Sequence, residues 1–83
     1  MDIQVSNISL NIIDSDIRKL FSAFGVLNSF EVNRNKFTGR SKGNAFVNMP
    51  VDAEARQAIA SLDNTMMDGK RISVSEFNAS PLW

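Results

Sequence analysis

The residue types that could do chemistry in this chain are carboxylates, basic side chains and a few aromatics, because its 83 residues contain no His and no Cys. This composition excludes a disulfide framework, a Cys-based zinc site and the commonest general base of enzymes. The acidic residues are spread over the expected helices and loops, and no two are placed as a catalytic pair. We therefore expect a binding protein that is not an enzyme and needs neither a metal nor a cofactor.

The basic residues fall into two short segments. Residues 34–42 carry four cations and no acid, namely Arg34, Lys36, Arg40 and Lys42. Lys70 and Arg71 follow an Asp-Gly turn, whereas five of the nine acids lie on or beside the expected helices. A formal net charge of zero argues against coating nucleic acid by bulk electrostatics. The clustering still allows one locally positive edge that could hold phosphates, the alternative being a solvated hairpin loop.

Two stretches have the period of an amphipathic helix. In the first, apolar residues recur at i, i+3, i+4 and i+7, at Ile17, Leu20, Phe21 and Phe24. Asp14 or Ser15 suits the N-cap of this helix, and Gly25 suits its C-terminal cap. A second helix is expected to start near Asp52, where the same spacing is repeated by Ala55, Ala58, Ile59 and Leu62.

Four stretches have the period of two that is typical of half-buried strands. They begin near Ile3, after Leu27, at Asn44 and near Ile72, with residues 34–42 as a polar loop between the second and third. Phe30 and Val32 are expected to point inward on the second strand. Ile72 and Val74, with Phe77 as a third candidate, mark the inward face of the last.

The order strand, helix, strand, strand, helix, strand predicts an α+β fold of the ferredoxin-like βαββαβ type. A four-stranded antiparallel sheet would carry both helices on one face and leave the other face open. At this length the chain has room for one compact domain, which we place at residues 1–77, followed by a short tail at 78–83.

At the third strand the sequence resembles the RNA-recognition motif family. The octapeptide of that family reads K/R-G-F/Y-G/A-F-V-x-F/Y, and residues 42–49, KGNAFVNM, match five of its seven specified positions. Residues 3–8, IQVSNI, look like its hexapeptide, and the similarity runs almost without gaps from residue 2 to residue 77. The short chain is similar to the small single-domain members that are typical of bacteria. The resemblance implies single-stranded RNA as the partner, bound on the open face of the sheet.

Strand parity predicts which residues face that RNA. Val5, Ala45, Val47 and Met49 should point at the helices, so their neighbours Gln4, Ser6, Asn44, Phe46 and Asn48 should point outward. On the flanking strands the open face should carry Ser29, Glu31, Asn33, Ser73 and Ser75. The resemblance implies three aromatics on this face for stacking bases, but Gln4 and Asn44 occupy two of those positions and only Phe46 remains.

These features predict a modest affinity. Losing two stacking partners would weaken binding by roughly 2–6 kcal/mol, of which hydrogen bonds from Gln4 and Asn44 to base edges could recover a part. We expect Phe46 to stack a base, and Lys42, Arg40 and Arg71 to hold phosphates, with Asn33 and Ser75 beside them on the face. Phe46 could instead pack beneath a loop or tail.

Other residues favour an alternative, a protein-interaction domain built on the same fold. Glu31 would repel phosphate, and Trp83, the only Trp, ends the tail and could cover the sheet, bind a protein partner or mediate self-association. For Phe37, in the loop, we expect local packing in preference to an RNA clamp.

No apolar run is long enough to cross a membrane, and we expect a reducing, cytoplasmic setting.

Overall fold

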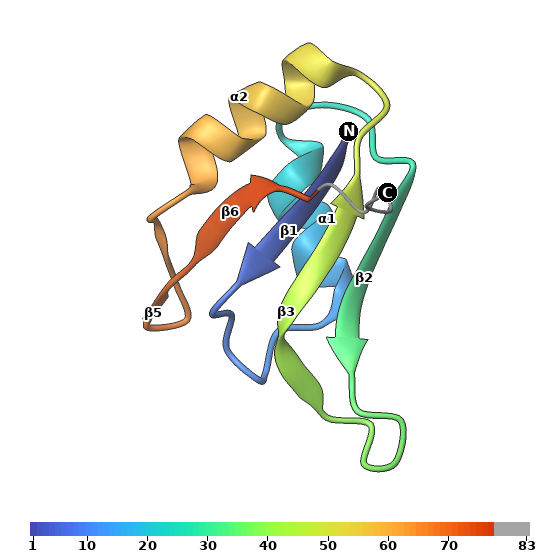
Figure 1. The fold of residues 1–83 in the computed structure, drawn as a ribbon. Coiled ribbons are helices and arrows are strands. Elements are labelled where there is room, and N and C mark those ends of the chain that lie inside the picture. Colours follow the sequence, from blue (N-terminus) through green and yellow to red (C-terminus); the bar gives the residue numbers. More distant parts are fainter. Residues whose placement is uncertain (78–83) are drawn as a thin grey trace, which may run out of the picture.

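The computed structural model describes residues 1–77, and its main elements follow the predicted order (Figure 1). They are β1 (Asp2–Ser6), α1 (Asp14–Ser22), β2 (Ser29–Arg34), β3 (Ser41–Asn48), α2 (Asp52–Leu62) and β6 (Ser73–Glu76). Two short strands, β4 (Met66–Met67) and β5 (Lys70–Arg71), lie between α2 and β6. The expected domain boundary after residue 77 and the expectations for Trp83 concern residues outside the described part of the chain.

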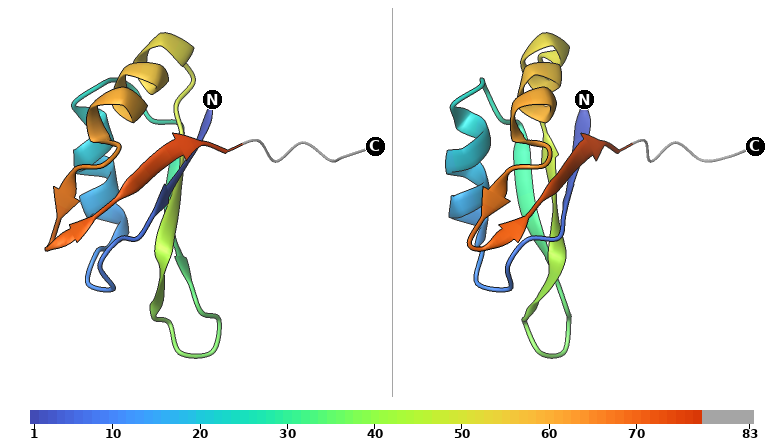
Figure 2. Two further views of the ribbon diagram at one scale, coloured as in Figure 1. Left: turned by 60° about the vertical axis from the view of Figure 1, so that its left-hand side comes forward. Right: turned by 90° about the vertical axis from the view of Figure 1, so that its left-hand side faces the viewer.

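The sheet has the strand order β2-β3-β1-β6, and each neighbouring pair is antiparallel. Both helices cover the same face of the sheet, and the opposite face carries neither of them (Figure 2). This arrangement confirms the predicted α+β, ferredoxin-like fold. It also puts β1 and β3, which carry the hexapeptide and the octapeptide, side by side in the middle of the sheet.

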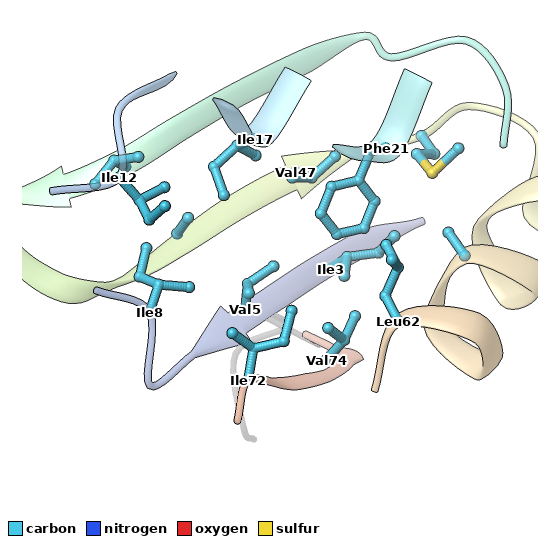
Figure 3. Packing of buried hydrophobic residues seen from close by; sticks show 14 of the residues in the cluster. Ile3, Val5, Ile8, Ile12, Ile17, Phe21, Val47, Leu62, Ile72 and Val74 are labelled. Carbon is cyan, nitrogen blue, oxygen red and sulfur yellow. The ribbon is translucent and has the colours of Figure 1, made fainter. Parts of the chain in front are cut away.

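The hydrophobic core lies between the sheet and the helices. Val5, Ala45, Val47 and Met49 are all buried there, as strand parity predicted. They pack with Ile17 and Phe21 of α1 and with the buried face of α2 (Figure 3). Because the apolar residues that alternate along β1 and from Ala45 onward along β3 are buried, the residues between them face outward.

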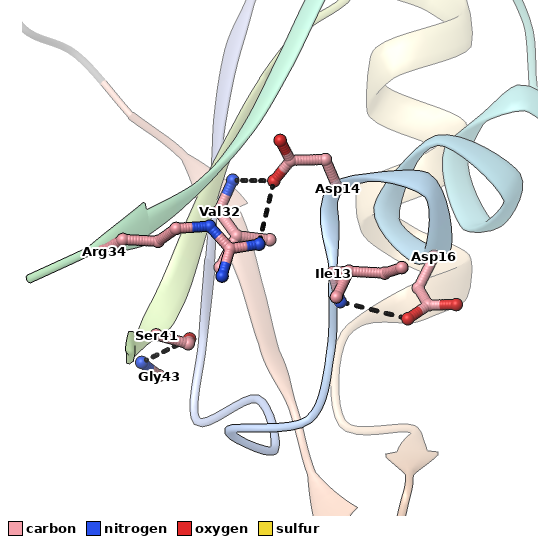
Figure 4. Close-up of polar contacts among 7 residues, drawn as sticks. All are labelled: Ile13, Asp14, Asp16, Val32, Arg34, Ser41 and Gly43. Atoms are coloured by element: carbon pink, nitrogen blue, oxygen red, sulfur yellow. Dashed lines mark hydrogen bonds and ion pairs between the residues drawn. The ribbon is translucent and has the colours of Figure 1, made fainter. Parts of the chain in front are cut away.

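The start of α1 differs from the prediction by one residue. Its N-cap is Ile13, so Asp14 and Ser15 already belong to the helix. Asp16 binds the helix start instead, because its carboxylate accepts a hydrogen bond of 3.0 Å from the Ile13 amide. The Asp14 carboxylate reaches over to β2, where Oδ1 accepts from the Val32 amide at 2.9 Å and lies 3.7 Å from Nη2 of Arg34 (Figure 4). Asp14 therefore links α1 to the sheet.

The prediction for Gly25 as the C-terminal cap of α1 is also wrong. The helix ends at Ser22 with Ala23 as its cap, two residues before the glycine. Gly25 is instead a point of close packing, since a Cβ at this position would overlap the side chain of Glu54 on α2. The Glu54 carboxylate also accepts a hydrogen bond from the Val26 amide at 3.3 Å. The glycine thus lets the α1–β2 connection approach α2.

The loop between β2 and β3 is shorter than predicted. Strand β3 begins at Ser41, which pairs with Arg34 across a local irregularity in the register. The loop is closed by a hydrogen bond of 2.8 Å from the Asn35 amide to the Arg40 carbonyl. Lys42 consequently lies on the strand, and alternation from buried Ala45 puts it on the open face.

The turn at Asp68 and Gly69 forms a small hairpin of its own. Both residues have positive φ, 52° and 80°, as a two-residue type I′ turn requires. The turn joins β4 to β5 as a separate two-stranded ribbon, where the sequence predicts only a turn. Arg71 therefore lies on this ribbon and outside the four-stranded sheet.

The prediction that Phe77 faces inward is wrong, whereas Ile72 and Val74 are buried as expected. Phe77 lies three positions after Val74, an odd offset, so the period of two directs Phe77 to the open face with Ser73 and Ser75. The Phe77 amide donates a hydrogen bond of 2.8 Å to the Asp2 carbonyl, which continues the pairing of β6 with β1.

Candidate nucleic-acid interface

The open face of the sheet is organised in rows that run across the strands. In the middle row, Gln4 of β1 pairs with Phe46 of β3 on one side and with Ser75 of β6 on the other. Glu31 of β2 pairs with Phe46 and completes the row. The register therefore brings together three predicted site residues, Gln4, Phe46 and Ser75, with the half-buried Phe46 ring at the centre.

A second row holds the predicted pair of asparagines. The side-chain amide of Asn33 donates a hydrogen bond of 3.3 Å to Oδ1 of Asn44. Asn44 pairs with Ser6 of β1, which in turn pairs with Ser73. The bond between the asparagines uses one acceptor and one donor, so the Asn33 oxygen and the Asn44 amide group can still contact a base edge.

A third row lies toward the opposite end of the sheet. Ser29 pairs with Asn48, and Asn48 pairs with Asp2. The Asn48 amide donates a hydrogen bond of 2.7 Å to Oδ1 of Asp2. This row gives the face a second carboxylate, Asp2, in addition to Glu31 of the middle row, and the two lie on opposite sides of β3.

Within residues 1–77, the open face carries two aromatic rings and not one. Phe77 packs against Phe46, with their ring centroids 5.1 Å apart and their planes at 59°. A tilted arrangement at this separation is favourable for two aromatic side chains. Sequence reasoning missed Phe77 as a site residue. The signal that could have found it is the alternation that starts from Val74, carried one residue beyond the end of β6.

The predicted phosphate contacts do not all lie in the same place. Lys42 is on the face, two residues before Asn44 on β3. Arg40 is exposed in the β2–β3 loop, where it lines a shallow groove with Leu10 and Asn11. Arg71 is on the β4–β5 ribbon, and its carbonyl accepts a hydrogen bond of 2.8 Å from the side chain of Asn7, just after β1. The three cations border one end of the sheet and do not form a cluster within it.

Phe37 does not pack locally, contrary to expectation. Its side chain is 96% exposed at the tip of the β2–β3 loop. The tip is held by Asn35, whose side-chain oxygen accepts hydrogen bonds from the amides of Phe37 and Thr38 at 2.8 Å and 3.1 Å. Because polar contacts shape the loop, the Phe37 ring is not needed to fold it.

Charge is divided between the two ends of the open face. The β2–β3 loop and the β4–β5 ribbon, which carry the basic residues, lie at the same end of the molecule (Figures 1 and 2). The carboxylates of Asp2 and Glu31 lie toward the other end, on the rows beyond the asparagine pair. A polyanion on this face would therefore be attracted at one end and repelled at the other.

Residues 1–77 hold no group of three or more acidic residues that could bind a metal ion. They also include no helix that is both long and apolar enough to cross a membrane.

Comparison with known proteins agrees with this geometry. Residues 3–73 match the family model of the RNA recognition motif. Glycine-rich RNA-binding protein 1 of Mycosarcoma maydis is 39% identical over 79 residues, which are 95% of this chain and 45% of that protein. The 31 kDa chloroplastic ribonucleoprotein of Nicotiana sylvestris is 42% identical over 73 residues, 88% of this chain and 23% of the relative. The chain thus spans less than half the length of these relatives.

Solved structures show the same similarity over the whole chain. The crystal structure of RNA binding protein PG1 has a TM-score of 0.92 at 32% identity, and the match covers 99% of both chains. A Sxl-lethal protein–RNA complex has a TM-score of 0.91 at 28% identity and covers 96% of this chain and 48% of the other. Because the family model spans most of the sequence, this chain belongs to the RNA recognition motif family.

Proposed function

We propose that this chain binds single-stranded RNA on the open face of its sheet. The observation that carries the proposal is the position of Phe46. Phe46 faces outward in the centre of the face, between Gln4 and Glu31 of the neighbouring strands, and its ring packs against Phe77. Names of the similar proteins, including RNA-binding proteins and a protein–RNA complex, support the same function.

Each part of the face has a role in this proposal. Phe46 stacks a base, because any base offers a π-face to an aromatic ring. Gln4 and the pair Asn33 and Asn44 contact base edges or ribose, and Ser75 extends this polar surface on β6. Lys42, Arg40 and Arg71 hold phosphates at the basic end, where their charges are not opposed by Asp2 or Glu31.

We further propose that the affinity is modest. Gln4 and Asn44 stand at two positions where the family octapeptide and hexapeptide usually have aromatics. Each lost stack is worth about 1–3 kcal/mol. Phe77 restores one aromatic surface at a different position, beside Phe46, so the loss is smaller than the sequence alone suggests.

The role we propose is binding without catalysis. The chain has neither His nor Cys. The two carboxylates of the open face, Asp2 and Glu31, lie in different rows and are not placed as a catalytic pair. A cytoplasmic location stays a prediction, and some of the similar proteins are named as chloroplastic.

The test is the binding of short fluorescent RNAs measured by anisotropy at low salt. Replacing Phe46 with Ala should raise the Kd about 5- to 150-fold, which corresponds to about 1–3 kcal/mol for one stack. Gln57→Ala is the matched control, because Gln57 is exposed on α2 and α2 covers the other side of the sheet.

Circular dichroism of both variants checks that they are folded. An unchanged Kd for the folded Phe46→Ala variant, or an equal loss in Gln57→Ala, would contradict the proposal. Either result would mean that RNA binds elsewhere or is not a ligand.

A further inference from the structure

The open face is hollowed at its acidic end. The hollow has a volume of about 300 Å³ and lies over β2 and β3, beside β1 and the end of β6. Its lining is formed by Asp2, Ser29, Phe30, Glu31, Phe46, Val47, Asn48 and Phe77. It is therefore the part of the face where both aromatic rings and both carboxylates meet.

The aromatic side of the hollow is suited to a planar ligand. Phe46 and Phe77 both line it, and their planes meet at 59°, so two differently oriented rings border the same space. Bases stack on exposed aromatic rings in single-stranded RNA recognition. This side of the hollow therefore favours a planar base as its ligand.

The polar side of the hollow presents hydrogen-bond acceptors. Glu31 lies directly across from Phe46 in the register, so its carboxylate stands next to the stacking ring. Among the ion pairs of residues 1–77, none involves Glu31. The other carboxylate, Asp2, already accepts the amide of Asn48 through Oδ1. Glu31 is the group best placed to receive hydrogen bonds from a bound base.

An ionised carboxylate accepts hydrogen bonds and donates none. Guanine has two adjacent donors on one edge, N1–H and the N2 amino group, which match the two oxygens of a carboxylate. Uracil has one donor, N3–H, between two carbonyl acceptors that a carboxylate repels. Adenine and cytosine each offer one amino group next to an acceptor. The complementarity is therefore best for guanine and worst for uracil.

The charge pattern agrees with a base, and not a phosphate, in this place. Asp2 and Glu31 repel phosphate, whereas the cations lie at the other end of the face. An RNA that crosses the sheet would keep its backbone toward the basic end and insert only an uncharged base edge between the carboxylates and the rings.

We propose that the hollow is a guanine-selective pocket, in which the base stacks on the Phe46 and Phe77 side and donates N1–H and N2–H to the Glu31 carboxylate. The proposal rests on the proposed function and deepens it, because it assigns a base preference to the same face. It gives Glu31, which counts against RNA binding when only its charge is considered, a positive role.

The test uses five-nucleotide RNAs made of uridine with only the central base varied, namely U, G, A, C and inosine. The protein should bind the G oligonucleotide about 5- to 150-fold more tightly than the U oligonucleotide, as a good bidentate contact does. Inosine, which keeps N1–H but lacks the amino group, should bind with intermediate affinity.

Glu31→Gln is the decisive variant, because it keeps the size of the side chain and replaces one acceptor oxygen by a donor. The G-over-U ratio should fall at least about fivefold, since the bidentate contact is lost. The matched control is Glu76→Gln, which removes the same charge. Glu76 pairs with the inward-facing Ile3 and lines a groove with Arg56 on the helix side, away from the hollow. The Glu76→Gln variant should leave the G-over-U affinity ratio unchanged.

A proton NMR spectrum gives a second reading of the same contact. The guanine N1 proton should become observable in the complex with the unmodified protein and not with Glu31→Gln, because only a hydrogen-bonded imino proton is protected from exchange with water.

The outcomes separate this inference from the proposed function. Equal binding of all five RNAs, or an equal gain in affinity for every RNA in both glutamine variants, would overturn the guanine pocket and leave RNA binding intact. A failure of every RNA to bind the unmodified protein would overturn the proposed function and this inference together.

Discussion

The rings of Phe46 and Phe77 lie 5.1 Å apart on the open face of the sheet, although 30 residues separate them in the sequence. The contact joins the centre of β3 to the residue that follows β6. Because Phe77 lines the hollow and packs against Phe46, we expect it to contribute to the proposed ligand surface and to support the ring that we propose stacks a base.

Replacing Phe77 with Ala should therefore weaken RNA binding about 5- to 150-fold, the range for one aromatic contact. The double variant Phe46→Ala/Phe77→Ala should lose less than the sum of the two single changes in binding free energy, because the rings contact each other. Anisotropy titrations of the four proteins measure this coupling. Strictly additive losses would show that the two rings act independently.

Two phenylalanines, one buried and one exposed, should differ in how much they contribute to the free energy of unfolding. Phe21 is fully buried between α1 and the sheet, so Phe21→Ala should lower the free energy of unfolding by about 3–5 kcal/mol. Phe37 is 96% exposed, so Phe37→Ala should change it by less than about 0.5 kcal/mol. Urea unfolding followed by circular dichroism compares them. A clear loss in Phe37→Ala would mean that the ring packs against the protein after all.

Asp14 should matter for stability through its contacts with β2. Asp14→Ala removes both the acceptor for the Val32 amide and the partner of Arg34, and should cost about 1–2 kcal/mol in free energy of unfolding. Asp14→Asn keeps an acceptor oxygen and loses only an exposed ion pair, so its cost should stay below about 1 kcal/mol. If urea unfolding finds the same loss for both variants, the ion pair and not the hydrogen bond carries the effect.

The salt dependence of RNA binding should indicate how many phosphates the protein contacts. With three or four contacts, the logarithm of the association constant should fall with the logarithm of salt concentration at a slope of about −2 to −3. Lys42→Ala should make this slope less steep by about 0.7. Lys19→Ala, an exposed lysine on α1, is the control and should leave it unchanged. A slope near zero in the unmodified protein would argue against phosphate contacts altogether.

The fold could be predicted from the sequence because each element has a clear period. Apolar residues every three or four positions at Ile17 and Phe21 indicate a helix, and alternation around Val5 and Val47 indicates strands. That same alternation correctly placed Gln4 and Phe46 on the open face. Local sequence patterns suffice here because burial on one side of a strand determines what faces the other side.

The errors arise where distant contacts decide the local structure. Asp14 is a good cap by type, but its carboxylate binds β2 and leaves Asp16 to bind the helix start. Gly25 resembles a cap, yet its lack of a side chain serves the approach of Glu54 from α2. Phe77 looked like a core residue because it is apolar, although the alternation from Val74 directs it outward and the hydrogen bond from its amide to the Asp2 carbonyl continues the strand.

The central claim, that RNA binds the open face through Phe46, is tested most directly by NMR. Titration of ¹⁵N-labelled protein with a pool of short RNAs at low salt should shift the amide signals of Gln4, Asn44, Phe46 and Ser75 together, and Phe46→Ala should strongly reduce these shifts. If the signals of the sheet stay unchanged, or only those of α1 and α2 move, the claim is contradicted.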